Sequence, residues 1–226
     1  MIVVSVKEAT ESLVKNFSEL DADHLHRAVS NAINRTLMKG RTVARKEVKE
    51  QYNIPQRYMS KVDKINASKK NLTGYIVASA TPVPMDAFDP KFETGSSLLT
   101  ISRRGKIVKR SRDLMRNPNV GVSIEVIKGK RETIPFAFMI STAKPRVFAR
   151  GQYRGGGAYG FVQRHKRTNS QGSDLPIKPL LSVTVHAAVL NEKVEKQIGK
   201  ELEAFYPQRL EHELEYQLKK MKEQSH

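Results

Sequence analysis

The chain has 226 residues, a formal net charge of +17 and no cysteine. The positive charge favours a polyanion or an acidic protein as partner, and the absence of thiols excludes disulfides and thiolate metal sites. No apolar run reaches the ~18 residues that a membrane helix needs. The N-terminal residues also lack the basic and apolar regions of a secretory signal, so we expect neither a membrane span nor export.

A long helix is the first element that the periodicity predicts clearly. Asp21 or Asp23 is suited to cap its start. Apolar residues, among them Ile33 and Leu37, then recur every three or four positions over the range 22–50, as on one face of a helix. The segment is therefore expected to form a helix roughly 45 Å long, at 1.5 Å per residue.

Shorter elements are expected on both sides of this helix. Residues 2–6 are mostly β-branched and favour a strand, and a helical pattern follows them up to Leu20. Pro55 interrupts the long helix and fits the first turn of a shorter one, which we expect to end near Ile65. These patterns predict a helical segment over 22–66.

The clearest hairpin lies within residues 120–140. Apolar residues alternate along both arms, and the residues 128–130, KGK, form the turn. One face of the hairpin is apolar and must pack on another element, for which the long helix is the simplest candidate. The core residues predicted from these patterns are Ile33, Leu37, Val122, Ile124, Phe136 and Phe138.

The C-terminal part returns to a helical period. Residues 146–151 suit a strand, and the helical period over 189–224 contains Pro207, which should kink or interrupt the helix. The predicted class is α+β, with long N-terminal helices and a kinked C-terminal helix packed on a mainly antiparallel β-sheet. We expect one domain over 1–226, made of a helical segment 22–66, a β-rich core 71–188 with basic loops at 103–116 and 152–174, and a C-terminal helical segment 189–224.

The positive charge is concentrated in three segments. Residues 22–70 carry twelve Lys or Arg against four acids, residues 103–116 carry seven against one, and residues 144–168 carry seven against none. Such segments suit either an anionic partner or a solvated surface, and both interpretations stay open at this point. The residues predicted to face a nucleic acid or a protein partner from basic loops are Arg103, Arg104, Lys106, Lys109, Arg110, Arg112, Arg150, Arg154, Arg164, Lys166 and Arg167.

The sequence contains no recognised catalytic motif. It lacks a Walker loop, a G-x-G-x-x-G fingerprint, an H-E-x-x-H metal motif and a nucleophile elbow. We therefore expect no enzyme activity, no metal and no cofactor. The strongest alternative is a magnesium-dependent nuclease centre in the stretch MDAFDPKFE, although its Asp-Pro pair equally indicates a turn. The charged residues of that stretch are Asp86, Asp89, Lys91 and Glu93.

Several stretches together resemble the phage minor tail protein Z family of tail-completion proteins. Within residues 28–88, AINRT, INASKKNL and PVPMDAF are similar to the family's A-x-N-R helix, KAS-like bend and apolar-Pro-apolar segment. Residues 134–150, IPFAFMISTAKPRVFAR, are similar to its Pro-x-Ala-Phe strand and the return strand ending in Arg. With LPIKPLLSVTV and the interrupted terminal helix, the resemblance covers roughly residues 22–222, and it departs from the family pattern in 89–118 and 208–223.

This resemblance implies a structural function without enzyme chemistry. Such a protein would complete the head-proximal end of a long phage tail, as part of a homo-oligomeric ring around the DNA channel of the virion. The implied partners are the tail terminator, connector and tube proteins, and any contact with DNA would be non-specific. The alternative, from a different class, is a stand-alone basic nucleic-acid-binding protein or a metal-dependent nuclease.

Overall fold

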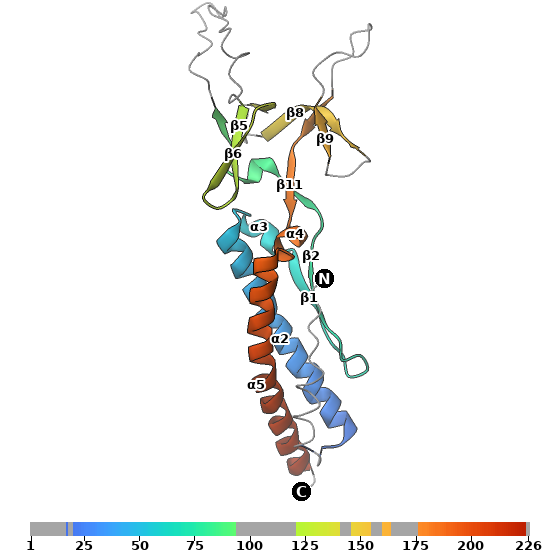
Figure 1. Cartoon of the computed structure of the whole chain (residues 1–226). Helices are drawn as coiled ribbons and strands as arrows, with labels where there is room; N and C mark the ends of the chain where they lie inside the picture. The colour runs from blue at the N-terminus through green and yellow to red at the C-terminus, as the bar shows by residue number, and fades with distance from the viewer. Residues whose placement is uncertain are drawn as a thin grey trace, which may run out of the picture. The chain divides into compact units, whose positions relative to one another are not determined.

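The computed structural model of the chain describes residues 17, 20–93, 121–140, 146–154, 160–163 and 176–224 (Figure 1). The chain divides into two compact units. We call Met1–Glu50, Gln56–Thr81 and Thr184–His226 the helical unit, and Gln51–Pro55 with Pro82–Val183 the strand unit. Both long helices and several small antiparallel sheets are present, which confirms the α+β class expected from the sequence.

Two long helices and one short ribbon of strands form the helical unit. Its strands β1 and β2 are antiparallel, with Val62 opposite Ala78 and Ile65 opposite Tyr75. None of the helices in the described ranges has the length and apolar content needed to span a bilayer. The elements of this unit are α2 (Ala22–Gln51), α3 (Gln56–Met59), β1 (Val62–Ile65), β2 (Tyr75–Ala78), α4 (Val185–Val189) and α5 (Glu192–Gln224).

The start of α2 is capped as the sequence indicates. The Oδ1 atom of Asp21 accepts a hydrogen bond of 2.7 Å from the backbone N–H of His24, and satisfies a donor that the first helical turn leaves free. This hydrogen bond is the main cause that holds the pKa of Asp21 below its usual value. Asp21 rather than Asp23 is therefore the N-cap, while Asp23 pairs with Arg27 and Lys69.

The core of the helical unit lies between α2 and α5, which run antiparallel and side by side (Figure 1). A Cβ atom added at Gly40 would lie 2.8 Å from a methyl carbon of Leu202. The large side chain of Leu202 therefore packs closely against α2 because residue 40 has no side chain. Buried positions recur every four residues on both helices, as in packing of i±4 ridges. The ridge of α2 is small (Ala28, Ala32, Thr36, Gly40, Ala44, Val48) and that of α5 is large (Val194, Ile198, Leu202, Tyr206, Leu210, Leu214).

Two expectations about the helices differ from the structure. Pro207 lies inside α5 without ending it, so of the two outcomes expected there, a kink or an interruption, the interruption does not occur. The short helix after Pro55 ends at Met59 instead of Ile65, because the next residues pair as strand β1 with β2. Local periodicity over so few residues could not reveal this pairing, which depends on a strand ten residues further along.

The described ranges contain four small antiparallel sheets, and three of them form the strand unit. One sheet has the order β4-β5-β6, a second has the order β10-β8-β7 with β9 also paired to β8, and a third pairs β3 with β11; the fourth, β1-β2, belongs to the helical unit. The elements are β3 (Pro82–Pro84), η1 (Met85–Ala87), β4 (Lys91–Glu93), β5 (Gly121–Ile127), β6 (Lys130–Ile134), β7 (Ala137–Ile140), β8 (Arg146–Tyr153), β9 (Phe161–Gln163), β10 (Ile177–Pro179) and β11 (Leu181–Thr184).

The predicted hairpin forms, but its second arm is shorter than expected. Gly129 has a φ of 76° and makes the turn between β5 and β6. The chain then turns at Pro135 and Phe136, because proline has no N–H to continue the β5–β6 ladder. Strand β7 begins after this turn and pairs with β8.

Because of this turn, the buried side of β7 is shifted by one residue from the alternation that the sequence predicts. Ala137 is buried, whereas Phe136 is 37% exposed and Phe138 is half-buried. Phe136 is therefore not the core residue that alternation predicted, and Phe138 is only partly covered. The other four predicted core residues are buried, namely Ile33, Leu37, Val122 and Ile124.

Strand β8 is the central strand of its sheet and changes partners along its length. Residues 146–149 pair with β7, whereas Gly151 to Tyr153 pair with β9. A Cβ atom at Gly151 would lie 2.2 Å from the carbonyl oxygen of Val162, and its φ of 152° is one that glycine tolerates best. Glycine at this position therefore allows β9 to approach β8 closely.

Candidate functional site

The acidic stretch that suggested a nuclease forms a turn held by an arginine. The guanidinium of Arg131 donates to Oδ2 of Asp89 at 2.7 Å and to its backbone carbonyl at 3.0 Å. Asp89 has a φ of 46°, an uncommon conformation for a non-glycine residue, and Lys91 lies 3.5 Å from the same carboxylate oxygen. No group of three potential metal ligands occurs among the described residues. The geometry matches the turn interpretation of Asp89-Pro90.

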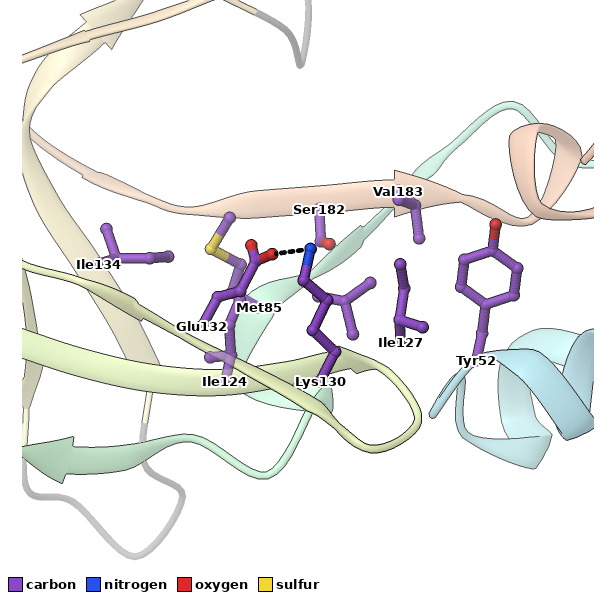
Figure 2. A pocket seen from close by; sticks show the side chains of 10 residues that line it. Tyr52, Met85, Ile124, Ile127, Lys130, Glu132, Ile134, Ser182 and Val183 are labelled. Atoms are coloured by element: carbon purple, nitrogen blue, oxygen red, sulfur yellow. Dashed lines mark ion pairs between the residues drawn. The ribbon is translucent and has the colours of Figure 1, made fainter.

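A pocket of about 350 Å³ lies on one face of β5 and β6 in the strand unit (Figure 2). Most side chains that line it are apolar, and the charged pair at its rim is Lys130 with Glu132, whose Nζ and Oε1 atoms are 2.9 Å apart. Both are about two-thirds exposed, so they neutralise each other at the surface. The lining residues are Tyr52, Met85, Ile124, Val126, Ile127, Lys130, Glu132, Ile134, Ser182 and Val183.

This pocket can accommodate an apolar group, but its polar atoms do not form a catalytic constellation. Ser182 has no histidine beside it in the lining, and the lining contains a single carboxylate, that of Glu132. A second hollow of about 390 Å³ shares Met85 and Ile134 with the first and is lined by Phe136, Tyr153 and Phe161 among others. The described part of the strand unit therefore has two adjacent apolar hollows, and the lining of the first contains no catalytic constellation.

Tyr153 fixes the chain beside the second hollow. Its hydroxyl donates to the carbonyl oxygen of Pro179 at 3.0 Å and accepts from the N–H of Leu181 at 2.9 Å. Partial burial of the ring raises the pKa of this tyrosine. The ring also lies edge-on to Phe161, with centroids 5.1 Å apart. Tyr153 thereby connects β8 to the segment between β10 and β11, a structural role.

The outward face of β8 carries cations and aromatic rings in alternation. Val147 and Ala149 are buried, so Arg146, Phe148 and Arg150 occupy the opposite face of the strand, and both arginines are exposed. Phe138 of β7 lies directly opposite Phe148, and the two rings stack with centroids 6.3 Å apart. The row of residues across this face is thus arginine, a phenylalanine pair, then arginine.

The structure brings together only part of the basic set that the sequence predicted. Arg150 lies in β8 and Arg154 follows its end. The remaining predicted residues of both loops lie outside the described residues, and they are Arg103, Arg104, Lys106, Lys109, Arg110, Arg112, Arg164, Lys166 and Arg167. Sequence reasoning missed Arg146, although the alternation in RVFAR places it on the same face as Arg150.

Two of the stretches quoted above meet in the helical unit. The side-chain amide of Asn34, from AINRT, donates to the carbonyl of Ala67 at 3.0 Å, and its oxygen accepts from the N–H of Ala67 at 2.8 Å. Ala67 belongs to INASKKNL, where Ser68 and Asn71 close a bend through two further hydrogen bonds. The asparagine therefore acts as a backbone mimic that ties the bend to α2.

Comparison with known proteins gives one match. The family model described as prophage minor tail protein Z (GPZ) matches residues 6–224, which is nearly the whole chain. No curated protein and no solved structure matches the chain.

Proposed function

The chain belongs to the prophage minor tail protein Z family, and from this membership we propose that it completes the head-proximal end of a phage tail as one subunit of a ring around the DNA channel. The coarser part of this statement is established, because the family consists of structural proteins of phage tails and not of enzymes. The position in the tail and the ring are the proposal.

The observation that carries the proposal is the family match over residues 6–224. A match of this extent includes residues of both units. The charge supports the same function, because a net charge of +17 suits a subunit placed beside DNA. The predicted loop 103–116 would then face either that DNA or an acidic neighbouring subunit.

The strand unit supports a function in assembly. Strand β6 is an edge of its three-stranded sheet, and β11 pairs with β3 alone among the described strands. Edge strands with open backbone groups are ready sites for pairing with another chain. The apolar hollows beside them, lined in part by Ile127 at 46% exposure, would be covered on docking. Tail terminator, connector and tube proteins are the partners that we propose for these surfaces.

A stand-alone nucleic-acid-binding protein is the second candidate. Arg146 and Arg150 of β8, which have no ion pair with any residue that the structure describes, favour it over a nuclease. The nuclease has less support, because the carboxylate of Asp89 is already bound by Arg131. Incubation with plasmid DNA and magnesium or manganese should give no cleavage. Cleavage that is lost in an Asp86→Ala plus Asp89→Ala variant would overturn the structural proposal.

The direct experiment is to delete the gene from the phage or prophage and examine the particles by electron microscopy. We expect filled heads and tails that are unjoined or abnormal at the head-proximal end, with normal particles restored by the gene supplied in trans. A tagged copy should be located at that end of the tail. A tag at the tail tip, or particles that lack the protein and are still normal, would contradict the proposal.

A further inference from the structure

We propose that the outward face of β8 and its neighbours is a phosphate-binding surface for duplex DNA. The face is defined by Arg146 and Arg150 on β8, with Phe138 and Phe148 between them, and we call it the β8 face. The inference deepens the proposed function and rests on it, since it names the polyanion that a subunit around a DNA channel would contact and the residues that make the contact.

The first observation is the absence of negative charge from the whole sheet. Strands β7, β8, β9 and β10 contain no aspartate or glutamate. Between residues 135 and 183 the sequence has eight Lys or Arg and a single acid, Asp174. Cations gathered without carboxylates repel one another, so an external anion would lower the energy of this surface.

The second observation is that Arg146 and Arg150 form no ion pair within the described residues, whereas arginines of the helical unit do. No ion pair or side-chain hydrogen bond of Arg146 or Arg150 occurs within the described part of the chain. In the helical unit, by contrast, Arg27, Arg41 and Arg209 each pair with a carboxylate. The guanidinium groups of the β8 face therefore retain their donors for another molecule, and guanidinium suits phosphate through two parallel hydrogen bonds.

The spacing allows the two arginines to reach separate phosphates. They are four residues apart on one strand, which corresponds to about 13 Å at ~3.3 Å per residue. Ile177 of β10 lies opposite Arg150 and is 44% exposed, so the surface beside this cation is apolar. Phe148 and its stacked partner Phe138 lie between the two arginines, and none of these residues is an acid that would compete for them. A rigid strand holds this spacing better than a loop would.

Duplex DNA fits this face better than the other polyanions. The rings of Phe138 and Phe148 stack on each other, so they are less available as platforms for the unstacked bases of a single strand. A second copy of this chain carries the same net charge of +17, so the acid-free β8 face is a poor contact surface between subunits of a ring. Contact with the phosphate backbone alone needs no base readout, and the sheet presents no helix to a groove.

The test measures binding of the full chain to a fluorescent duplex by anisotropy over a range of salt concentrations. The variant Arg146→Gln plus Arg150→Gln is compared with Lys46→Gln plus Lys196→Gln. The control lowers the net charge equally, at two lysines that are 71% and 76% exposed and pair with acids on their own helices. Loss of two phosphate contacts should reduce the slope of log affinity against log salt by about 1.8. The control should change the slope much less.

Three results would overturn the proposal. Equal slopes for the two variants would mean that the β8 face does not contact phosphate. Tighter binding to a single strand with the same number of phosphates would mean base stacking. Binding of poly-glutamate that depends on the two arginines, without such dependence for DNA, would assign the face to an acidic protein.

A second readout keeps the proposal testable if the arginine variant does not fold. A photoreactive phenylalanine analogue at Phe148 should crosslink to the duplex on irradiation, whereas the same analogue at the exposed Tyr216 of α5 should not. Equal crosslinking from both positions would overturn the proposal. Neither assay depends on the position in the virion, so their failure is distinguishable from failure of the proposed function, which the deletion experiment tests.

Discussion

The helical unit and the strand unit differ in how completely they bury their apolar side chains. The helical unit packs large side chains of α5 onto small residues of α2, and it contains most of the buried apolar residues among the described ones. The strand unit consists of short sheets whose backbones approach closely, and it has hollows of about 350 and 390 Å³. The helical unit completes a core from its own residues. The described part of the strand unit leaves apolar surface exposed, together with cations that have no ion pair within the same described part.

The largest expected effect tests where the stability lies. Leu202 is fully buried against Gly40, so Leu202→Ala should reduce the free energy of unfolding by about 2–5 kcal/mol. Phe136 of the strand unit is 37% exposed and stacks on Phe161, so Phe136→Ala should have an effect of about 1 kcal/mol. Urea denaturation followed by circular dichroism measures both. Equal losses would remove the distinction between the units.

One glycine in each unit, Gly121 in the strand unit and Gly40 in the helical unit, gives the next largest expected difference in stability. A Cβ at Gly121 would lie 2.1 Å from the carbonyl oxygen of Ile134, and backbone cannot move aside cheaply, so Gly121→Ala should lower the melting temperature clearly. A Cβ at Gly40 would meet only the ends of the Ile76 and Leu202 side chains, which can rotate. The better helix propensity of alanine, about 1 kcal/mol, partly offsets that crowding. Gly40→Ala should therefore be much milder, and the reverse order would contradict this account.

The smallest effect concerns the start of α2. The folded pKa of Asp21 is lowered, so its contribution to stability is present above the unfolded pKa, near 3.8, and is lost as pH falls through the lower folded value. Asp21→Asn keeps the capping acceptor but does not titrate. The stability of the native chain should therefore decrease more than that of the variant when pH falls below 3.8. Identical pH profiles would show that Asp21 is not the cap in solution.

Elements that depend on neighbouring residues could be predicted from the sequence, and elements that depend on a distant strand could not. The stripe of α2, the cap at Asp21 and the turn at Gly129 depend on neighbouring residues, and each was predictable. Strand β1 and the phase of β7 were not, because each is decided by a partner strand, and Pro135 shifted the phase by one residue.

The candidate surface shows the same division. The basic character of residues 144–168 is evident in the sequence, and it predicts Arg150 as a residue that faces a partner. Which face of β8 points outward was not evident, because it is set by the burial of Val147 and Ala149. Arg146 joins Arg150 only once that face is known. The stacking of Phe138 on Phe148 likewise follows from the pairing of β7 with β8.

The antiparallel pairing of α2 and α5 has a consequence for the order of folding during synthesis. Asn31 and Glu213, which are hydrogen-bonded across the two helices, are separated by 182 residues. The ribosome must therefore produce the whole strand unit before α2 meets its partner, and α2 waits with its small-residue ridge uncovered. Contacts of such large sequence separation fold slowly, so the apolar face of α2 is exposed to solvent until α5 has been synthesised.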